Sequence, residues 1–448
     1  MKYKKIRQRI VNHPPRFLAM GFFAVILIGS LLLMLPFAQG EGQNTTYLDA
    51  LFTATSAVCV TGLTTVATVS HWTLFGQIVI ILLIQIGGLG FMTITTVMAM
   101  VLGKRITLND RLIIKEQMNT VSLSGMVKLI RYVLASTFII EGIGALLLSS
   151  QFIPEFGLAR GLYVSIFQSI SSFCNAGFDV LGTASIVKYN NNPLILLTIG
   201  SLIILGGLGF NVYMDVTANK LNFRKYALHT KIVLSMTGIL LLAGTIGFLT
   251  LEALNANTMA DMSFSTKTLN AFFQSVTTRT AGYFSMDQAQ LTDPSIMLSI
   301  ILMFIGGSPA GTAGGIKTVT FAMLLLMTYS EIKGNRDLEI FQRRISIDQG
   351  KRAISIMVLG LSWVLTATFV LLALEPFALQ DLLFEVTSAF ATVGLTRNLT
   401  PQLTEISKSV LILSMYIGRV GTMTLVFAFA NNKDKKYHKE AYGNVIIG

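Results

Sequence analysis

Four short segments, rich in hydroxyl and small side chains, each end in a glycine and could present backbone carbonyls to a cation. Each glycine follows a phenylalanine by ten residues. Rings of backbone carbonyls can replace the water shell of K⁺, as four TVGYG loops do. Turning successive carbonyls to one side requires backbone angles that glycine adopts without a Cβ clash. The candidate selectivity-filter residues are the last three of each segment: Val60, Thr61 and Gly62; Asn175, Ala176 and Gly177; Thr280, Ala281 and Gly282; and Thr392, Val393 and Gly394.

These segments recur at a period of about 110 residues, which indicates an internal repeat. A second set of glycines follows the same rhythm, about 25 residues after the first: Gly87, Gly206, Gly306 and Gly418. We expect the pairs Gly87-Gly88 and Gly206-Gly207 to let helices approach closely. Each repeat is predicted to be a helix, a re-entrant loop and a second helix. Four re-entrant loops that only pack a helical bundle remain the alternative.

Eight apolar runs are long enough to cross a bilayer, which takes about 20 residues. They cover residues 17–37, 74–102, 128–150, 193–216, 231–251, 295–329, 353–374 and 408–430. The runs 74–102 and 295–329 exceed the length of a span, which predicts tilt or a break. The resulting division is an N-terminal segment 1–16, repeats 17–102, 128–217, 229–329 and 353–430, and a C-terminal tail 431–448.

Composition and charge support this membrane assignment. The chain of 448 residues is 52% hydrophobic and 12% charged, about half the charge of a soluble domain. Most of its 34 Lys and Arg residues lie in short blocks between apolar runs, so the positive-inside rule places both termini in the cytoplasm. Scattered basic blocks do not form the continuous face that nucleic acid requires. Two cysteines and four histidines fit no metal centre, and the spans lack the paired His, Asp or Glu residues of a membrane-embedded enzyme.

The predicted fold class is therefore an all-α polytopic membrane protein. Eight transmembrane helices and four re-entrant half-helices surround one pseudo-fourfold pore. Irregular backbone at membrane depth is tolerated only inside protein or along a water-filled cavity, and four such loops would meet at the axis. The negative C-terminal ends of the half-helices would point at the cation. The pattern predicts a pore for a monovalent cation, K⁺; a cation channel without a regulator is the alternative.

A glycine-rich stretch interrupts the sixth apolar run and is the candidate gate. Gly and Pro break a helix and free its carbonyls. It is not a phosphate-binding loop, because Ile316 separates Gly315 from Lys317 and no strand precedes it. A simple packing kink is the alternative. The candidate gate residues are Gly306, Gly307, Ser308, Pro309, Ala310, Gly311, Thr312, Ala313, Gly314, Gly315 and Lys317, together with Arg419.

Three charged residues depart from the apolar pattern. Arg279 immediately precedes the third filter segment, and we expect it to point behind the filter, braced by Asp287 or Glu385. Arg419 lies within the last span, where a charge is costly and is usually functional or paired. It could contact the gate, or it could form a buried ion pair with Glu141 or Asp215. Glu141 could itself couple an ion, although a packing hydrogen bond serves equally well.

These motifs resemble the Trk/Ktr/HKT superfamily of K⁺ transporters over nearly the whole chain. The resemblance rests on His13-Pro-Pro-Arg16, the two Gly-Gly-Leu-Gly-Phe motifs at 87–91 and 206–210, the segments 276–283 and 304–317, and Tyr416-Ile-Gly-Arg-Val-Gly421. The short segment before the first span is closer to the Ktr-type membrane subunit than to the Trk type. Glycine at all four filter positions is similar to the K⁺-selective pattern.

The resemblance implies a K⁺ uptake protein of the plasma membrane, gated by an intramembrane loop near Arg419. It also implies a homodimer with one pore per protomer and a cytoplasmic ring of nucleotide-binding regulatory subunits. ATP or ADP would bind that ring, because this chain offers no nucleotide site and is expected to bind no cofactor besides the transported K⁺. Na⁺ dependence is common among such systems, and membrane lipid is the remaining expected partner.

Overall fold

The computed structural model describes residues 14–90, 93, 126–182, 185–220, 222–334 and 337–429. The predicted tail 431–448, nearly all of the segment 1–16 and most of the end of the run 74–102 lie outside these residues. Helices are the main element of the described structure, and loops connect them. A two-stranded hairpin, β1 (Leu338–Ile340) and β2 (Arg343–Ile345), joins the third repeat to the fourth.

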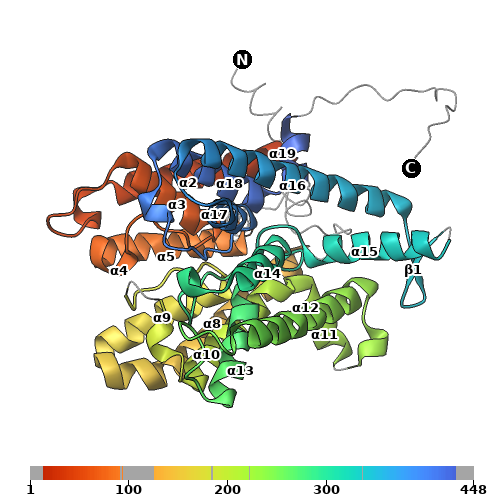
Figure 1. Ribbon diagram of the computed structural model, residues 1–448, viewed down its shortest axis with the longest axis horizontal. Coiled ribbons are helices and arrows are strands. Elements are labelled where there is room, and N and C mark those ends of the chain that lie inside the picture. The colour runs from red at the N-terminus through yellow and green to blue at the C-terminus, as the bar shows by residue number, and fades with distance from the viewer. Residues whose placement is uncertain are drawn as a thin grey trace.

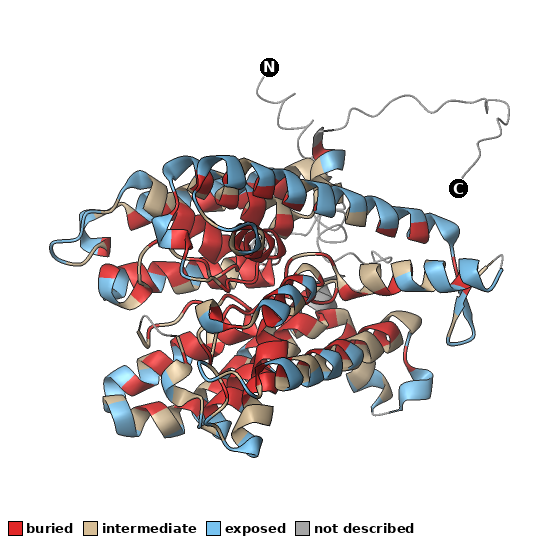
Figure 2. Ribbon diagram, viewed as in Figure 1, coloured by how far each residue is buried: buried red, intermediate tan, exposed pale blue. Residues whose placement is uncertain are grey.

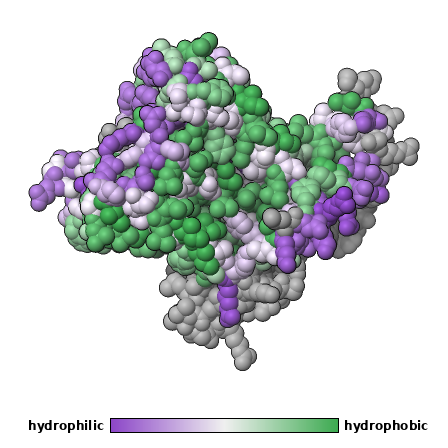
Figure 3. All heavy atoms as spheres, turned by 90° about the horizontal axis from the view of Figure 1, so that it is seen from below, coloured by the Kyte–Doolittle hydropathy of each residue, from purple (hydrophilic) through white to green (hydrophobic). Residues whose placement is uncertain are grey.

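The first helix of each repeat is long and apolar enough to cross a membrane. Large apolar side chains cover the outward faces of these helices, for example Phe23, Phe138, Leu242 and Phe369. In Figure 3 hydrophilic residues gather toward two ends of the visible face, and apolar residues lie between them. This pattern is that of a multi-pass membrane protein with lipid around its middle. The four helices are α2 (Pro14–Leu33), α8 (Met126–Phe156), α12 (Leu228–Glu252) and α16 (Ile347–Leu374).

In the second, third and fourth repeats the second helix is interrupted, and in the first repeat α5 ends at Leu89. The predicted spans 193–216 and 408–430 are each two helices, bent by 94° and 91°, so the structure adds a bend that was not predicted in either run. The break expected in 295–329 is confirmed: residues 305–317 are not helical. The segments are α5 (Leu74–Leu89), α10 (Pro193–Leu208) with α11 (Phe210–Asn219), α14 (Asp293–Phe304) with α15 (Thr318–Ile332), and α18 (Glu405–Val420) with α19 (Thr422–Phe429).

A glycine produces each bend. Gly209 has φ 90° and ψ 140°, and Gly421 has φ 93° and ψ 133°; Gly90, which ends α5, adopts the similar pair of 84° and 136°. This region is accessible to glycine and is costly for other residues. Each of these glycines lies three residues after a glycine of the second predicted set. In the third repeat the same place holds Pro309, which cannot donate a helical hydrogen bond.

Four half-helices fill the space between the spans. They run for 13 to 16 residues rather than the expected ten or so: α3 (Tyr47–Cys59), α9 (Leu158–Phe173), α13 (Phe264–Thr277) and α17 (Leu379–Ala391). Their inner residues form the core of the molecule, shown red in Figure 2. Phe52, Phe167 and Phe384 are at most 1% exposed. The third copy differs, because Phe272 is only partly buried and Phe273 is fully buried.

The four repeats close into a ring. The second helix of each repeat packs against the half-helix of the next: α5 on α9, α10 on α13, α14 on α17, and α18 on α3. Figure 1 shows the first and last repeats together in the upper half and the second and third in the lower half. Short connecting elements complete the described fold: α4 (Thr68–His71), η1 (Pro36–Ala38), η2 (Val187–Tyr189), η3 (Phe223–Lys225), η4 (Gln288–Gln290) and η5 (Thr400–Gln402).

Candidate functional site: a ring of four glycine loops and the loop beside it

Each half-helix is followed by a residue in the left-handed region, although none of the four is glycine. Their φ angles are 58° at Val60, 60° at Asn175, 74° at Thr280 and 53° at Thr392. Three of these residues are β-branched, for which positive φ is a genuine outlier. Such strain costs about 1–3 kcal/mol per residue and persists only where the surroundings enforce it. Four equivalent outliers at equivalent positions therefore mark a functional feature, which residue types alone did not reveal.

The glycine two residues later also has positive φ in every copy. The angles are 95° at Gly62, 70° at Gly177, 81° at Gly282 and 92° at Gly394, and the residue between has negative φ. Alternation of this kind turns successive peptide groups in a loop to the same side. The same backbone pattern is thus repeated four times.

The four glycines lie next to one another in cyclic order. A Cβ added to Gly62 would lie 2.6 Å from the carbonyl oxygen of Ala176, and one on Gly177 would lie 2.6 Å from that of Ala281. A Cβ on Gly282 would lie 2.6 Å from the oxygen of Val393, and one on Gly394 would lie 2.1 Å from that of Thr61. The ring closes from the fourth loop back to the first. No residue larger than glycine fits at these four positions without displacing backbone.

Hydroxyl groups hold the loops from behind. The amide of Gly62 donates to Ser56 Oγ at 3.0 Å, and that of Gly394 donates to Ser388 Oγ at 3.1 Å. In the second loop Ser171 Oγ donates to the carbonyl of Phe178 at 2.7 Å. Tyr283, which is fully buried, also donates its hydroxyl to Phe178, at 3.0 Å, and so links the third loop to the second. The hydroxyl-rich composition of the half-helices therefore fixes the geometry of the loops.

Glycines of the second predicted set seat the second helices against the half-helices. A Cβ would lie 2.0 Å from the carbonyl oxygen of Val58 at Gly87, 1.9 Å from that of Phe173 at Gly206, and 1.7 Å from that of Phe390 at Gly418. The close approach expected at Gly87 and Gly206 is confirmed, and Gly418 makes an equivalent contact in the fourth repeat. The third repeat differs: a Cβ on Gly306 would meet the carbonyl oxygen of Gly314 at 2.3 Å and Thr280 Cγ2 at 3.3 Å. There the glycine packs within residues 305–317, the non-helical segment that holds the candidate gate residues Gly306–Gly315 and Lys317 and that we call the inserted loop.

The inserted loop is tied to the second repeat by backbone hydrogen bonds. The amides of Ser308 and Thr312 donate to the carbonyls of Gly207 (2.9 Å) and Gly206 (3.1 Å), and the amide of Phe210 donates to Ala310 (3.0 Å). Thr312 Oγ1 also donates to the carbonyl of Phe173 at 3.1 Å. The carbonyls at the end of a helix have no partner within that helix. Those of Gly206 and Gly207, at the end of α10, find their partners on the inserted loop.

The same loop touches the starts of two filter segments. A Cβ on Gly314 would lie 2.0 Å from Thr392 Oγ1, and one on Gly315 would lie 3.1 Å from Ala391 Cα. Gly306 approaches Thr280, as noted above. The loop therefore lies against the side of the ring where the half-helices end, and it contacts the second, third and fourth repeats.

Arg419 connects the inserted loop to the first repeat. Its guanidinium donates to the carbonyl of Thr312 on the loop, and to the carbonyls of Gly87 and Gly88 at the end of α5. Lys317, at the end of the loop, donates to the carbonyl of Ala313 at 2.6 Å. Arg419 thus contacts the loop, and the alternative of a buried ion pair with Glu141 was wrong. Glu141 instead accepts from Gln85 Nε2 at 3.2 Å, as a packing hydrogen bond.

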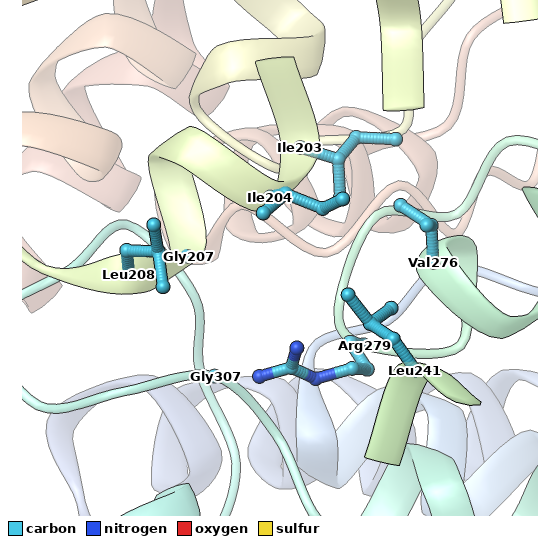
Figure 4. A pocket seen from close by; sticks show the side chains of 8 residues that line it. All are labelled: Ile203, Ile204, Gly207, Leu208, Leu241, Val276, Arg279 and Gly307. Carbon is cyan, nitrogen blue, oxygen red and sulfur yellow. The ribbon is translucent and has the colours of Figure 1, made fainter. Parts of the chain in front are cut away.

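Arg279 points away from the ring, into a small cavity between α10, α12 and the inserted loop (Figure 4). Its Nη2 donates to Thr237 Oγ1 on α12 at 3.3 Å. The expected brace by Asp287 or Glu385 was wrong, because both carboxylates bond elsewhere. Asp287 accepts from the amide of Ala289 at 3.0 Å, and Glu385 accepts from Thr400 Oγ1 at 2.9 Å. Asp287 therefore caps its own turn, and Glu385 holds the loop that follows the fourth filter segment.

Comparison with known proteins agrees with this architecture. The family model described as "Cation transport protein" (TrkH) matches residues 3–439. The crystal structure of the potassium transporter TrkH from Vibrio parahaemolyticus superposes with a TM-score of 0.71. The two chains are 18% identical, and the match covers 92% of this chain and 85% of the Vibrio chain.

Two curated relatives are similar over almost their whole length. "Potassium/sodium uptake protein NtpJ" of Enterococcus hirae is 45% identical over 441 residues, 97% of each chain. "Ktr system potassium uptake protein B" of Bacillus subtilis is 40% identical over 420 residues, 94% of each chain.

The fold and the loop ring define a multi-pass membrane protein with four re-entrant segments in one closed ring. The chain belongs to the TrkH family of cation transport proteins.

Proposed function

We propose that this chain is the pore-forming subunit of a K⁺ uptake system in the plasma membrane. The observation that carries the proposal is the closed ring of Gly62, Gly177, Gly282 and Gly394, each preceded by a strained left-handed residue. Carbonyl rings built on such loops suit a dehydrated K⁺ ion. The printed names of both relatives include potassium uptake, which supports the choice of ion. That of the Enterococcus protein also includes sodium, so Na⁺ dependence belongs to the proposal.

The inserted loop serves as the gate in this proposal. It lies against the inner starts of the filter segments at Thr280 and Thr392, and its glycines allow it to change shape. Arg419 ties it to α5, which lies on the opposite side of the ring from the loop's own repeat. Opening would require the loop to release Arg419 and the carbonyls of Gly206 and Gly207.

Regulation and assembly follow from the basic inner face and from the family resemblance. Both termini are proposed to be cytoplasmic, since the basic blocks lie on their side. A second copy of the chain and a ring of nucleotide-binding subunits are the proposed partners. ATP or ADP would act on that ring. The name of the Bacillus relative, a component of a Ktr system, supports such a multi-subunit arrangement.

Uptake of ⁸⁶Rb⁺ in a host that lacks K⁺ uptake tests the filter directly. We expect the wild-type chain to restore growth at low K⁺, and Gly62→Ser to lower K⁺/Na⁺ discrimination, because the added Cβ meets the Ala176 carbonyl. Gly42→Ser is the matched control: Gly42 also has positive φ (76°), but no atom lies within 4 Å of an added Cβ. Discrimination that is the same in Gly62→Ser and wild type would refute the filter assignment.

A further inference from the structure

The Arg279 guanidinium is a buried charge whose hydrogen-bonding capacity is largely unused. The residue is 7% exposed, and Nη2 makes its one described hydrogen bond, to Thr237. Nε has no acceptor, and no carboxylate of the described residues lies within 4 Å. Buried charges in proteins are normally paired, because leaving one unpaired is costly. Arg279 therefore lacks a counter-charge among the residues that surround it.

The space that Arg279 faces is apolar apart from the guanidinium and backbone. Ile203, Ile204 and Leu208 line it on one side, and Leu241 and Val276 line it on another. Gly207 and Gly307 complete the wall, and the guanidinium extends toward Gly307 (Figure 4). An arginine fork in an apolar chamber selects an anion, since Arg presents donors and no acceptor.

The chamber has room for a small occupant. About 10 Å³ is free for the centre of a water-sized sphere, the lower limit for one water molecule, so a larger monatomic ion would enter with a small outward shift of the Arg279 side chain. A neutral water molecule there would find few of the two to four polar partners that buried water requires. A carboxylate or phosphate group would not fit. The geometry points to a site for one monatomic halide ion, chloride, bound to the Arg279 guanidinium beside the third filter loop.

Such a site would resolve an electrostatic conflict. Arg279 immediately precedes Thr280, so an uncompensated positive charge would lie next to a ring that holds a cation. Charges interact strongly in a low-dielectric interior. A bound halide makes a neutral pair with Arg279 and leaves the field of the carbonyl ring intact. The binding measurement does not require transport, so this inference can fail while the K⁺ filter stands.

Thermal unfolding of the purified full-length protein in detergent tests the site. Chloride would be titrated as KCl against potassium gluconate at constant K⁺. A ligand that binds only the folded state raises the midpoint temperature in a saturable way. We expect that rise for the wild type and its loss in Arg279→Gln. Arg160→Gln, which removes an exposed guanidinium stacked on Phe156, should retain the rise. An equal chloride response in wild type and Arg279→Gln would overturn the inference, as would no response in the wild type.

A second measurement does not depend on the variant being stable. Crystals of the wild-type protein grown with bromide as the halide should show one anomalous peak within contact distance of the Arg279 guanidinium. Density in the chamber without anomalous signal identifies water and refutes the halide. Sulfate in place of chloride should give no stabilisation, because the chamber is too small for it.

Discussion

Replacing Arg419 with glutamine should release the inserted loop and raise K⁺ flux. In the structure the guanidinium holds the Thr312 carbonyl on the loop and the Gly87 and Gly88 carbonyls on α5 at the same time. Glutamine is shorter and uncharged, so it cannot span both partners. The loop keeps its backbone bonds to Gly206 and Gly207 but loses its tie to the first repeat.

The size of the effect follows from the bond that opening must break. A hydrogen bond from a charged donor contributes about 1.5–3 kcal/mol. If only the bond to Thr312 stabilises the closed loop against the open one, its loss shifts that equilibrium by about 10- to 140-fold, at 1.4 kcal/mol per factor of ten. Flux in the absence of regulatory subunits should rise by a factor in this range, up to the limit set by the filter. Arg419→Lys keeps the charge but not the fork, so it should fall between wild type and Arg419→Gln.

The assay is ⁸⁶Rb⁺ uptake into proteoliposomes that contain the chain alone, with equal amounts of folded protein checked by unfolding temperature. Arg352→Gln is the control, because it removes the same charge from an exposed position in the same repeat. Thr312→Val gives an independent route: it removes the 3.1 Å bond from Oγ1 to the Phe173 carbonyl and should also raise flux, by less. A well-folded Arg419→Gln protein that transports no faster than wild type would refute the role of this tie.

Two further predictions concern stability. Gly418→Ala should lower the midpoint of thermal unfolding sharply, because the added Cβ would lie 1.7 Å from the Phe390 carbonyl oxygen. Gly238→Ala, on α12, is the control and should leave the midpoint unchanged, because no atom lies within 4 Å of its added Cβ. Equal midpoints in the two variants would contradict the packing argument. Glu375, just after α16, accepts from the amide (2.8 Å) and hydroxyl (2.7 Å) of Thr404. Burial raises the pKa of this carboxyl, but these bonds and one from Ser407 outweigh burial and hold the pKa below its usual 4.5. The unfolded chain then binds the proton more tightly, so the stabilisation is present above about pH 4.5 and is lost as pH falls through the folded pKa. The unfolding midpoint should drop in that window, and Glu375→Gln should flatten the drop; a drop of the same size in the variant would exclude Glu375 as its source.

Several features were predictable because they depend on local sequence. The length of the apolar runs predicted the first helix of each repeat. The glycine cluster and Pro309 predicted the break after α14. The spacing of phenylalanine and glycine gave the four loops, since each copy must make the same turn with the same residues. The two 90° bends at Gly209 and Gly421 were missed, although the motifs that contain them were noted. A glycine within an apolar run is compatible with both a continuous and a bent helix, so the run alone does not decide.

The partners of the charged residues could not be predicted. Arg279 was assigned to a carboxylate, but Asp287 caps its own turn and Glu385 accepts hydrogen bonds from Thr396, Arg397 and Thr400. Arg419 donates to the carbonyls of Thr312 and Gly87, which lie more than 100 and more than 300 residues away in the sequence. Such partners depend on which helix ends meet in space, and residue types do not encode that.

The sequence alone thus determined that the chain has four equivalent membrane units, each with a glycine turn, because hydrophobic length and φ preference are local properties. Tertiary structure alone decided that the four turns close into one ring, each glycine against a carbonyl of the next repeat. It also decided that the inserted loop lies against one side of that ring. Three of the four contacts join segments about 110 residues apart, and the one that closes the ring, between Gly394 and Thr61, joins segments more than 300 residues apart. These contacts exist only once the whole bundle has assembled.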